Sequence, residues 1–164
     1  MKLIPLTQGY FAQVDDEDYE QLIKLKWSVK IDYRKHGTVC YARHTKVQMG
    51  KRVSIYMHRL IMEITDSKIF TDHKNGDGLD NRKINLRKCT NRQNLYNTNA
   101  ITGSKSQYKG ISWSKEKRKW MSKMMINGKN KSIGSFDNEL DAAICYDKIA
   151  IKIHGEFIKL NVKP

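Results

Sequence analysis

The segment TDHKNGDGLDNRKINLRKCTNRQN, residues 71–94, decides how this sequence is interpreted. Seven of the residues between Asp72 and Asn99 are asparagines. Apolar residues in the segment follow neither the helical nor the strand period over any useful length. Side-chain oxygen and nitrogen atoms set its pattern, which indicates a polar functional site.

Local signals within the segment predict a strand, a turn region and a helix. Thr90 and Gln93 have the spacing of a capping box, which places Asn94 in the first turn of a helix. Asp72 and His73 are expected to end a strand. A β-hairpin and a helix could then face each other across a pocket.

The residue types suit hydrolysis of a phosphodiester. A carboxylate and an amide oxygen, from Asp72 and Asn94, suit a magnesium ion better than zinc. His73 could take a proton from an attacking water while the metal stabilises the leaving oxygen. Cys89 is interpreted as a small core residue, because no second cysteine is spaced to share a metal with it.

Taken together, residues 55–97 resemble the HNH nuclease module, the ββα-metal fold, in the form found in phage and intron-encoded homing endonucleases. The resemblance implies that Asp72 and Asn94 bind one Mg²⁺ or Mn²⁺ ion per active site, that His73 is the general base and that Asn85 orients His73.

Two flanking positions are also compared with this family. His58-Arg59 resembles its upstream His-Arg-Leu, which implies that Arg59 lies near a DNA phosphate. Lys74 departs from the apolar residue that usually follows the histidine.

The charge balance favours a polyanionic partner. Thirty-one Lys and Arg against 17 Asp and Glu give a net charge of +14 over 164 residues. Residues 105–131 alone hold nine Lys and Arg against a single Glu. Such a concentration of positive charge is typical of a surface that binds nucleic-acid phosphates.

The same basic region predicts a three-stranded antiparallel meander followed by one helix. Residues 108–115, 119–126 and 129–136 have strand composition, and Asn127-Gly128 is a strong hairpin signal. Asp137-Asn138 then precedes apolar residues at helical spacing up to His154-Gly155.

Residues 108–162 resemble the ethylene-response-factor (APETALA) type of DNA-binding domain, which has this plan of sheet and helix. The resemblance rests on several short matches: Tyr108-Lys-Gly-Ile-Ser, Lys119-Trp120, Ile133-Gly-Ser-Phe136-Asp, Ala142-Ala143 to Tyr146-Asp147, and Gly155-Glu to Leu160-Asn161. It implies that seven side chains meet DNA: Lys109, Ser112, Ser114, Lys123, Met125, Asn130 and Ser132. Base preference is not carried over, because the plant domains tend to have Arg and Trp at several of these positions.

The expected fold class is therefore α+β: a ββα-metal HNH nuclease module, a small N-terminal α/β subdomain, and a C-terminal three-stranded antiparallel sheet plus one helix. We place these at residues 55–100, 1–54 and 107–164, with 101–106 as a linker. In the N-terminal part, Asp15 to Asp18 open a short helix and three strands follow. Whether this part supports the fold or contacts DNA through a few basic residues stays open.

The sequence lacks a spanning apolar run or a signal peptide, and its three cysteines fit reduced thiols, so a cytoplasmic protein of a bacterial host is expected. The sequence predicts a metal-dependent HNH DNA endonuclease of the homing type, encoded by a phage or mobile element, that nicks double-stranded DNA as a monomer. Two alternatives remain: a transcription-factor-like DNA-binding protein without nuclease activity, and an RNA-binding basic protein.

Overall fold

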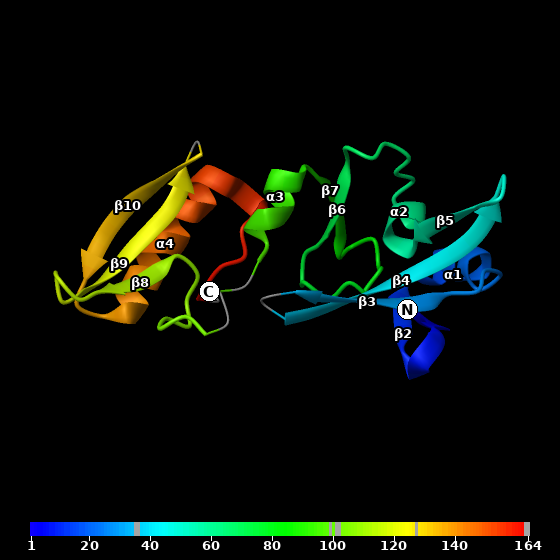
Figure 1. Ribbon diagram of the computed structural model, residues 1–164, viewed down its shortest axis with the longest axis horizontal. Coiled ribbons are helices and arrows are strands. Elements are labelled where there is room, and N and C mark those ends of the chain that lie inside the picture. Colours follow the sequence, from blue (N-terminus) through cyan, green and yellow to red (C-terminus); the bar gives the residue numbers. More distant parts are fainter. Residues whose placement is uncertain (35–36, 99, 101–102, 127, 163–164) are drawn as a thin grey trace. The chain divides into compact units, whose positions relative to one another are not determined.

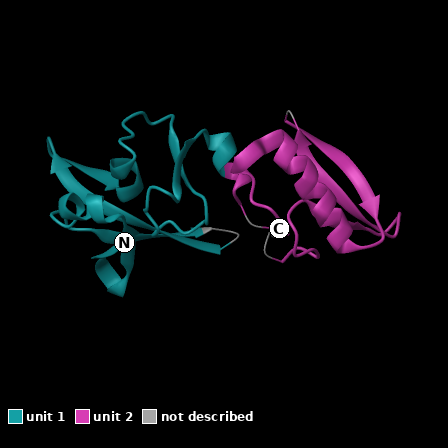
Figure 2. Cartoon of the chain, turned by 180° about the vertical axis from the view of Figure 1, so that it is seen from behind, with its two compact units in different colours: residues 1–94 teal, residues 95–164 magenta. Residues whose placement is uncertain are grey.

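The computed structural model describes residues 1–34, 37–98, 100, 103–126 and 128–162. The chain divides into two compact units, residues 1–94 and 95–164 (Figure 2). The fold is mixed α/β, with small antiparallel sheets and, among the described residues, four α-helices (Figure 1).

The first unit begins with a hairpin and a short helix. Strands β1 (Lys2–Pro5) and β2 (Phe11–Val14) pair antiparallel around a 3-10 turn at Thr7–Gly9, and α1 (Asp16–Leu22) follows. The acidic residues in the first turn of α1 lie where the helix dipole favours negative charge, as the sequence predicts.

A three-stranded sheet comes next, in the order β3 (Ser28–Arg34), β4 (Gly37–Gln48), β5 (Lys51–Tyr56). These are the three strands expected from the sequence, and residues 35 and 36, between β3 and β4, lie outside the described residues. The sheet packs against the N-terminal hairpin, and the largest buried side chains of this core include Ile4, Val14, Trp27 and Met57.

The polar segment forms a second hairpin followed by a helix. After α2 (Met57–Ile61), strands β6 (Phe70–His73) and β7 (Leu86–Cys89) pair antiparallel, and α3 (Asn91–Tyr96) follows after a single residue. The boundary between the two units falls within α3.

The second unit contains the predicted meander, with strand order β10-β9-β8. Strands β9 (Lys119–Ile126) and β10 (Lys129–Phe136) match their predicted bounds, whereas β8 (Ile111–Ser114) is shorter than predicted. Of the predicted hairpin pair, Asn127 lies outside the described residues and Gly128 has φ 77°.

One face of this sheet is covered by α4 (Glu139–His154), whose N-cap is Asn138 and whose C-cap is Gly155, at the start of a 3-10 turn (Gly155–Phe157). Three alanines of α4, Ala142, Ala143 and Ala150, are fully buried against the sheet. They pack against Ile111 and Met124, and larger apolar side chains surround this contact. The small side chains let the helix lie close to the sheet.

Hydrogen bonds join distant parts of the second unit. The side-chain amide of Asn161 accepts from the backbone NH of Lys109 and donates to its carbonyl. The backbone NH of Asn161 donates to the buried carboxylate of Asp147. Ser106, in the segment predicted as a linker, is buried and its hydroxyl donates to Glu139 at 2.6 Å. Ser106 therefore packs as part of this unit.

Cys40, Cys89 and Cys145 are free thiols, and Cys89 is buried as predicted. Within the described ranges, the chain has no helix long and apolar enough to cross a membrane.

Candidate active site

The β6–β7 hairpin positions the two residues expected to carry the chemistry. Asp72 lies opposite Arg87 and His73 lies opposite Leu86 in the strand register. Both site residues are buried, with 3% of Asp72 and 6% of His73 exposed. His73 is the last residue of β6, so the predicted position of the Asp-His pair at a strand end is confirmed.

Asp72 forms an ion pair across the hairpin. Its Oδ2 accepts from Nε of Arg87 at 2.7 Å and lies 2.5 Å from a terminal guanidinium nitrogen. This pair compensates the cost of burying the carboxylate. A carboxylate has about four acceptor positions, so the pair with Arg87 does not by itself use all of them.

The imidazole of His73 contacts Asn81, with Nε2 3.5 Å from the amide oxygen. The amide nitrogen of Asn81 donates to the Leu79 carbonyl, so its oxygen faces the ring. An oxygen that can only accept favours the tautomer with hydrogen on Nε2, which makes Nδ1 the basic nitrogen. Burial lowers the pKa of His73, while Asn81 and neighbouring carboxylates oppose the shift. The ring is therefore neutral near pH 7 and able to accept a proton.

Aromatic side chains enclose this imidazole. The His58 ring lies edge-on to His73 with centroids 5.1 Å apart, and Tyr41 contacts both histidines. Burial lowers the pKa of His58 to about 3, and two neighbouring groups, Arg59 and the protonated form that His73 takes in acid, add to this shift. His58 therefore stays neutral and acts as a packing partner of His73 over the physiological range.

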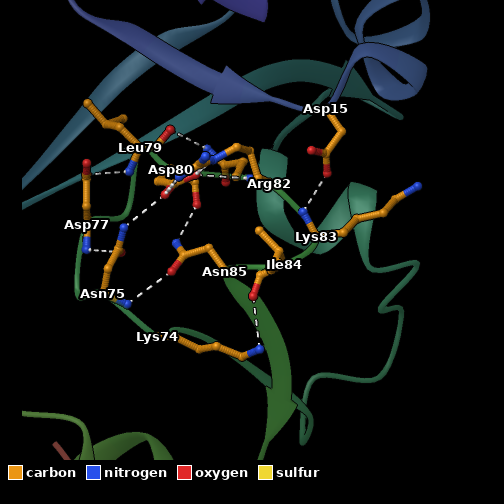
Figure 3. Close-up of polar contacts among 11 residues, drawn as sticks. Asp15, Lys74, Asn75, Asp77, Leu79, Asp80, Arg82, Lys83, Ile84 and Asn85 are labelled. Atoms are coloured by element: carbon orange, nitrogen blue, oxygen red, sulfur yellow. Dashed lines mark hydrogen bonds and ion pairs between the residues drawn. The ribbon is translucent and has the colours of Figure 1, made fainter. Parts of the chain in front are cut away.

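Asn85 holds the loop that follows His73 (Figure 3). Its amide oxygen accepts from the backbone NH of Asn75 at 3.0 Å, and its amide nitrogen donates to the Asp80 carbonyl at 2.8 Å. The side-chain contact with His73 comes from Asn81, which sequence reasoning did not assign. The only sequence feature that pointed to Asn81 is its position in the asparagine-rich segment.

The same loop is cross-linked through the carboxylate of Asp80. Arg82 donates to both of its oxygens at 2.7 Å, and the side chain of Asn75 donates to it at 2.9 Å (Figure 3). The hydrogen bonds from Arg82 lower the pKa of Asp80. This network holds residues 75–82 mainly through polar contacts, while Leu79 packs against the core of the first unit.

The N-terminal hairpin and α1 also support the loop. Gln13 in β2 exchanges backbone hydrogen bonds with Leu79 and Asn81, each at 2.8 Å. The carboxylate of Asp15 accepts from the backbone NH of Lys83 at 2.7 Å (Figure 3). The N-terminal residues therefore have a supporting role, which the sequence had left open beside a role in DNA contact.

A glycine allows the loop to approach β4 closely. A Cβ atom on Gly78 would overlap the carbonyl oxygen of Cys40 and the ring of Tyr41. Because Tyr41 contacts His73, this close approach also fixes one wall around the imidazole.

The capping box predicted before α3 is present. Thr90 NH donates to the Gln93 side-chain oxygen at 2.8 Å, and Gln93 NH donates to the Thr90 hydroxyl at 3.2 Å. The helix carries Asn94, which is half-buried, in its first turns.

The two predicted metal ligands have donor atoms that suit a hard divalent cation. Asp72 would offer a carboxylate and Asn94 an amide oxygen, which are ligand types that magnesium accepts. The described residues contain no cluster of three or more His, Cys, Asp or Glu side chains. The predicted set of one carboxylate and one amide does not require such a cluster.

Comparison with known proteins finds distant viral relatives. Uncharacterized HNH endonuclease L560 of Acanthamoeba polyphaga mimivirus is 28% identical over 160 residues, which cover 97% of this chain and 79% of that protein. Protein 3.8 of Escherichia phage T7 is 29% identical over 92 residues, which cover 56% of this chain and 75% of that protein. No family model and no solved structure matches.

The side chain of Arg59 forms hydrogen bonds within the first unit. Its guanidinium donates to the carbonyls of Ile69 and Asp66, each at 2.8 Å, and to that of Ile64 at 3.3 Å. These bonds organise the chain between α2 and β6. The contacts give Arg59 a structural role that the resemblance did not imply, and they leave few donors for a phosphate.

Six of the seven positions expected to meet DNA lie on the sheet face opposite α4. Lys123 pairs with Ser132 and Met125 with Asn130, while Ile111 and Met124 on the other face join the core. We call this outer face the polar sheet face: Ser112, Ser114, Lys123, Met125, Asn130 and Ser132.

Lys109 is the exception and corrects the prediction. It precedes β8, and its ammonium donates to the Tyr96 carbonyl at 2.7 Å. Burial lowers its pKa to about 8. Lys109 therefore connects two segments of the second unit, and its ammonium is not part of the polar sheet face.

Proposed function

We propose that this chain is a metal-dependent DNA endonuclease of the HNH type. The observation that carries the proposal is the buried imidazole of His73 next to the buried Asp72 carboxylate at the end of β6. A chain-long similarity to a mimivirus protein named as an HNH endonuclease supports it. On this proposal β6, β7 and α3 form the ββα-metal module.

In the proposed mechanism, His73 accepts the proton of the attacking water on Nδ1, because Asn81 favours hydrogen on Nε2. Asp72 and Asn94 would hold a magnesium or manganese ion, which when bound would supply charge stabilisation at the leaving oxygen of the phosphodiester. Arg87 holds Asp72 in place through the hairpin register. Asn85 fixes the loop that positions Asn81 and hence His73.

The polar sheet face is the proposed source of DNA affinity and site preference. Its side chains are polar or flexible, and the basic turns around it supply a positive field. A preferred target is what distinguishes a homing-type enzyme from an indiscriminate nuclease.

The basic test is incubation of the protein with supercoiled plasmid, with and without magnesium. Relaxed or linear product that depends on the metal supports the nuclease proposal. Tight DNA binding with no product in magnesium or manganese favours the transcription-factor-like alternative. Tighter binding to folded RNA than to duplex DNA at matched salt favours the RNA-binding alternative.

One active centre addresses one phosphodiester at a time, so we propose that a monomer nicks duplex DNA. The rate of nicked-circle formation should then rise linearly with protein concentration. Direct formation of linear product with a second-order dependence would show that two protomers act together.

A further inference from the structure

The end of the sheet in the first unit is a free two-stranded ribbon. Strand β4 pairs with β3 as far as Arg43, and beyond it pairs with β5 alone. We call residues 45–54 the β4–β5 ribbon. All ten of these residues are exposed, and the ribbon extends beyond the rest of the first unit (Figure 1, cyan).

The ribbon carries positive charge without compensation. Residues 33–62 contain seven Lys and Arg and no Asp or Glu. Lys46, Lys51 and Arg52 have no ion-pair partner within the described part of the chain. Lys2, Lys30 and Lys83 in the same unit, by comparison, each lie within 3.5 Å of a carboxylate. Three cations without a carboxylate partner among the described residues therefore lie together on one projecting element.

Apolar side chains occupy the tip of the ribbon. Met49 is 95% exposed and Val47 is 71% exposed, so neither packs on the protein. Met49 also has φ 50°, a backbone conformation that favours glycine or asparagine. Neither burial nor turn geometry in the free protein favours methionine at this position, so a binding partner is the better explanation.

We propose that the β4–β5 ribbon is a second DNA-contacting element, which enters a groove of the duplex near the phosphodiester that is cut. A two-stranded ribbon fits the major groove of B-DNA, and exposed methionine can also act as an apolar wedge at a base step. Lys46, Lys51 and Arg52 contact phosphates, and Val47 and Met49 reach the floor of the groove. This proposal rests on duplex DNA being the substrate. The deep, narrow major groove of double-stranded RNA does not admit such a ribbon.

A pair of charge-matched variants tests the phosphate contacts. The ribbon variant combines Lys51→Ser and Arg52→Ser, and the control combines Lys24→Ser and Lys26→Ser, two exposed cations of the same unit. Duplex affinity is measured against salt concentration without metal, in a His73→Ala background, so that no cleavage interferes. Two lost phosphate contacts should flatten the slope of log affinity against log salt by about 1.8 in the ribbon variant. The control should keep the original slope.

Equal slopes and affinities for the two variants would overturn the proposal. So would a ribbon variant that loses affinity for folded RNA or anionic vesicles but keeps its affinity for duplex DNA. Cleavage by the chain with His73 intact reports separately on the nuclease. If the ribbon variant binds DNA normally while the parent chain cuts DNA, the ribbon proposal is wrong and the nuclease proposal stands. If the chain binds DNA through the ribbon but never cuts it, the nuclease proposal is wrong and the ribbon proposal stands.

Met49→Gly provides an independent test with effects of opposite sign. Glycine relieves the positive φ, so thermal stability should be equal or higher, while duplex affinity should fall because the apolar contact is lost. A hydroxyl-radical footprint should shrink at the segment that the ribbon protects. Unchanged affinity together with an unchanged footprint would exclude a groove contact by this tip.

Discussion

The loop of residues 74–85 and the sheet-helix unit of residues 107–162 are stabilised by different interactions. The loop is fixed mainly by hydrogen bonds of side-chain amides and carboxylates to its backbone and to one another, with Asn85 and Asp80 at the centre. The second unit is fixed by apolar packing of α4 on three strands, which leaves the outer sheet face polar. A loop held by polar groups can place an imidazole in a defined position, whereas a sheet held from one side can present its other face to a ligand.

The largest expected effect comes from the loop-supported base. Replacing His73 by alanine should slow DNA cleavage by about 10²- to 10⁴-fold, the usual contribution of a general base. DNA affinity should stay unchanged, because His73 is buried in the hairpin and carries no positive charge. Single-turnover cleavage and a separate binding measurement without metal distinguish the two. A variant with an undiminished rate would contradict the assignment of the base.

Asn81→Ala tests whether the contact with His73 matters for the same step. It should lower the turnover rate more than the Michaelis constant changes, and it should have no further effect when His73 is already alanine. An additive loss in the double variant would mean that Asn81 acts on the fold alone.

The strands, the helices and the position of the Asp-His pair at the end of a strand could be predicted from the sequence, because they depend on local patterns. The capping residues Thr90 and Gln93 predicted the start of α3, and Asn138 predicted the start of α4. The role of Asn81 could not be predicted, since several asparagines of the segment were equivalent before the chain folded. Lys109 was misplaced because a resemblance aligns positions, while the direction of a side chain depends on Tyr96 in a segment outside that resemblance.

Acid should weaken the loop before it weakens the apolar unit. The pKa of Asp80 lies below its usual value, so its contribution to stability is present above the unfolded-state pKa of about 3.9 and is lost as pH falls through the lower folded value. Asp80→Asn should reduce the unfolding free energy of the chain by about 1–3 kcal/mol at pH 7, because Arg82 loses a charged partner.

Equilibrium unfolding between pH 2 and pH 7 measures this contribution. The wild-type and Asp80→Asn proteins should converge in stability at the acid end. A constant difference over the whole range would show that the effect of the substitution does not come from the charge of Asp80.

The polar sheet face should respond to salt, whereas the loop should not. Lys123→Ser should reduce duplex affinity and flatten the salt dependence by about 0.9 in slope, as expected for one lost phosphate contact. Lys148→Ser is the matched control, since Lys148 is equally exposed but lies on α4, which covers the opposite face. Cleavage under single-turnover, saturating conditions should be unaffected in both variants. Equal losses for the two lysines would mean that net charge, and not this face, determines affinity.

The smallest expected effect comes from removing one of two helix caps, one at α3, next to the β6–β7 hairpin, and one at α4 in the apolar unit. Asn138 Oδ1 accepts from Leu140 NH at 2.8 Å at the start of α4, and the Thr90 hydroxyl accepts from Gln93 NH at the start of α3. Replacing either residue by alanine should cost about 1 kcal/mol of stability. Only Thr90→Ala should also lower turnover, because α3 carries Asn94, whereas α4 carries no residue assigned to the reaction. Unfolding curves and cleavage rates of the two variants therefore separate stability from chemistry. If Asn138→Ala reduced turnover as much as Thr90→Ala, the reaction would depend on overall stability, and the division of labour between the polar loop and the apolar unit would not hold.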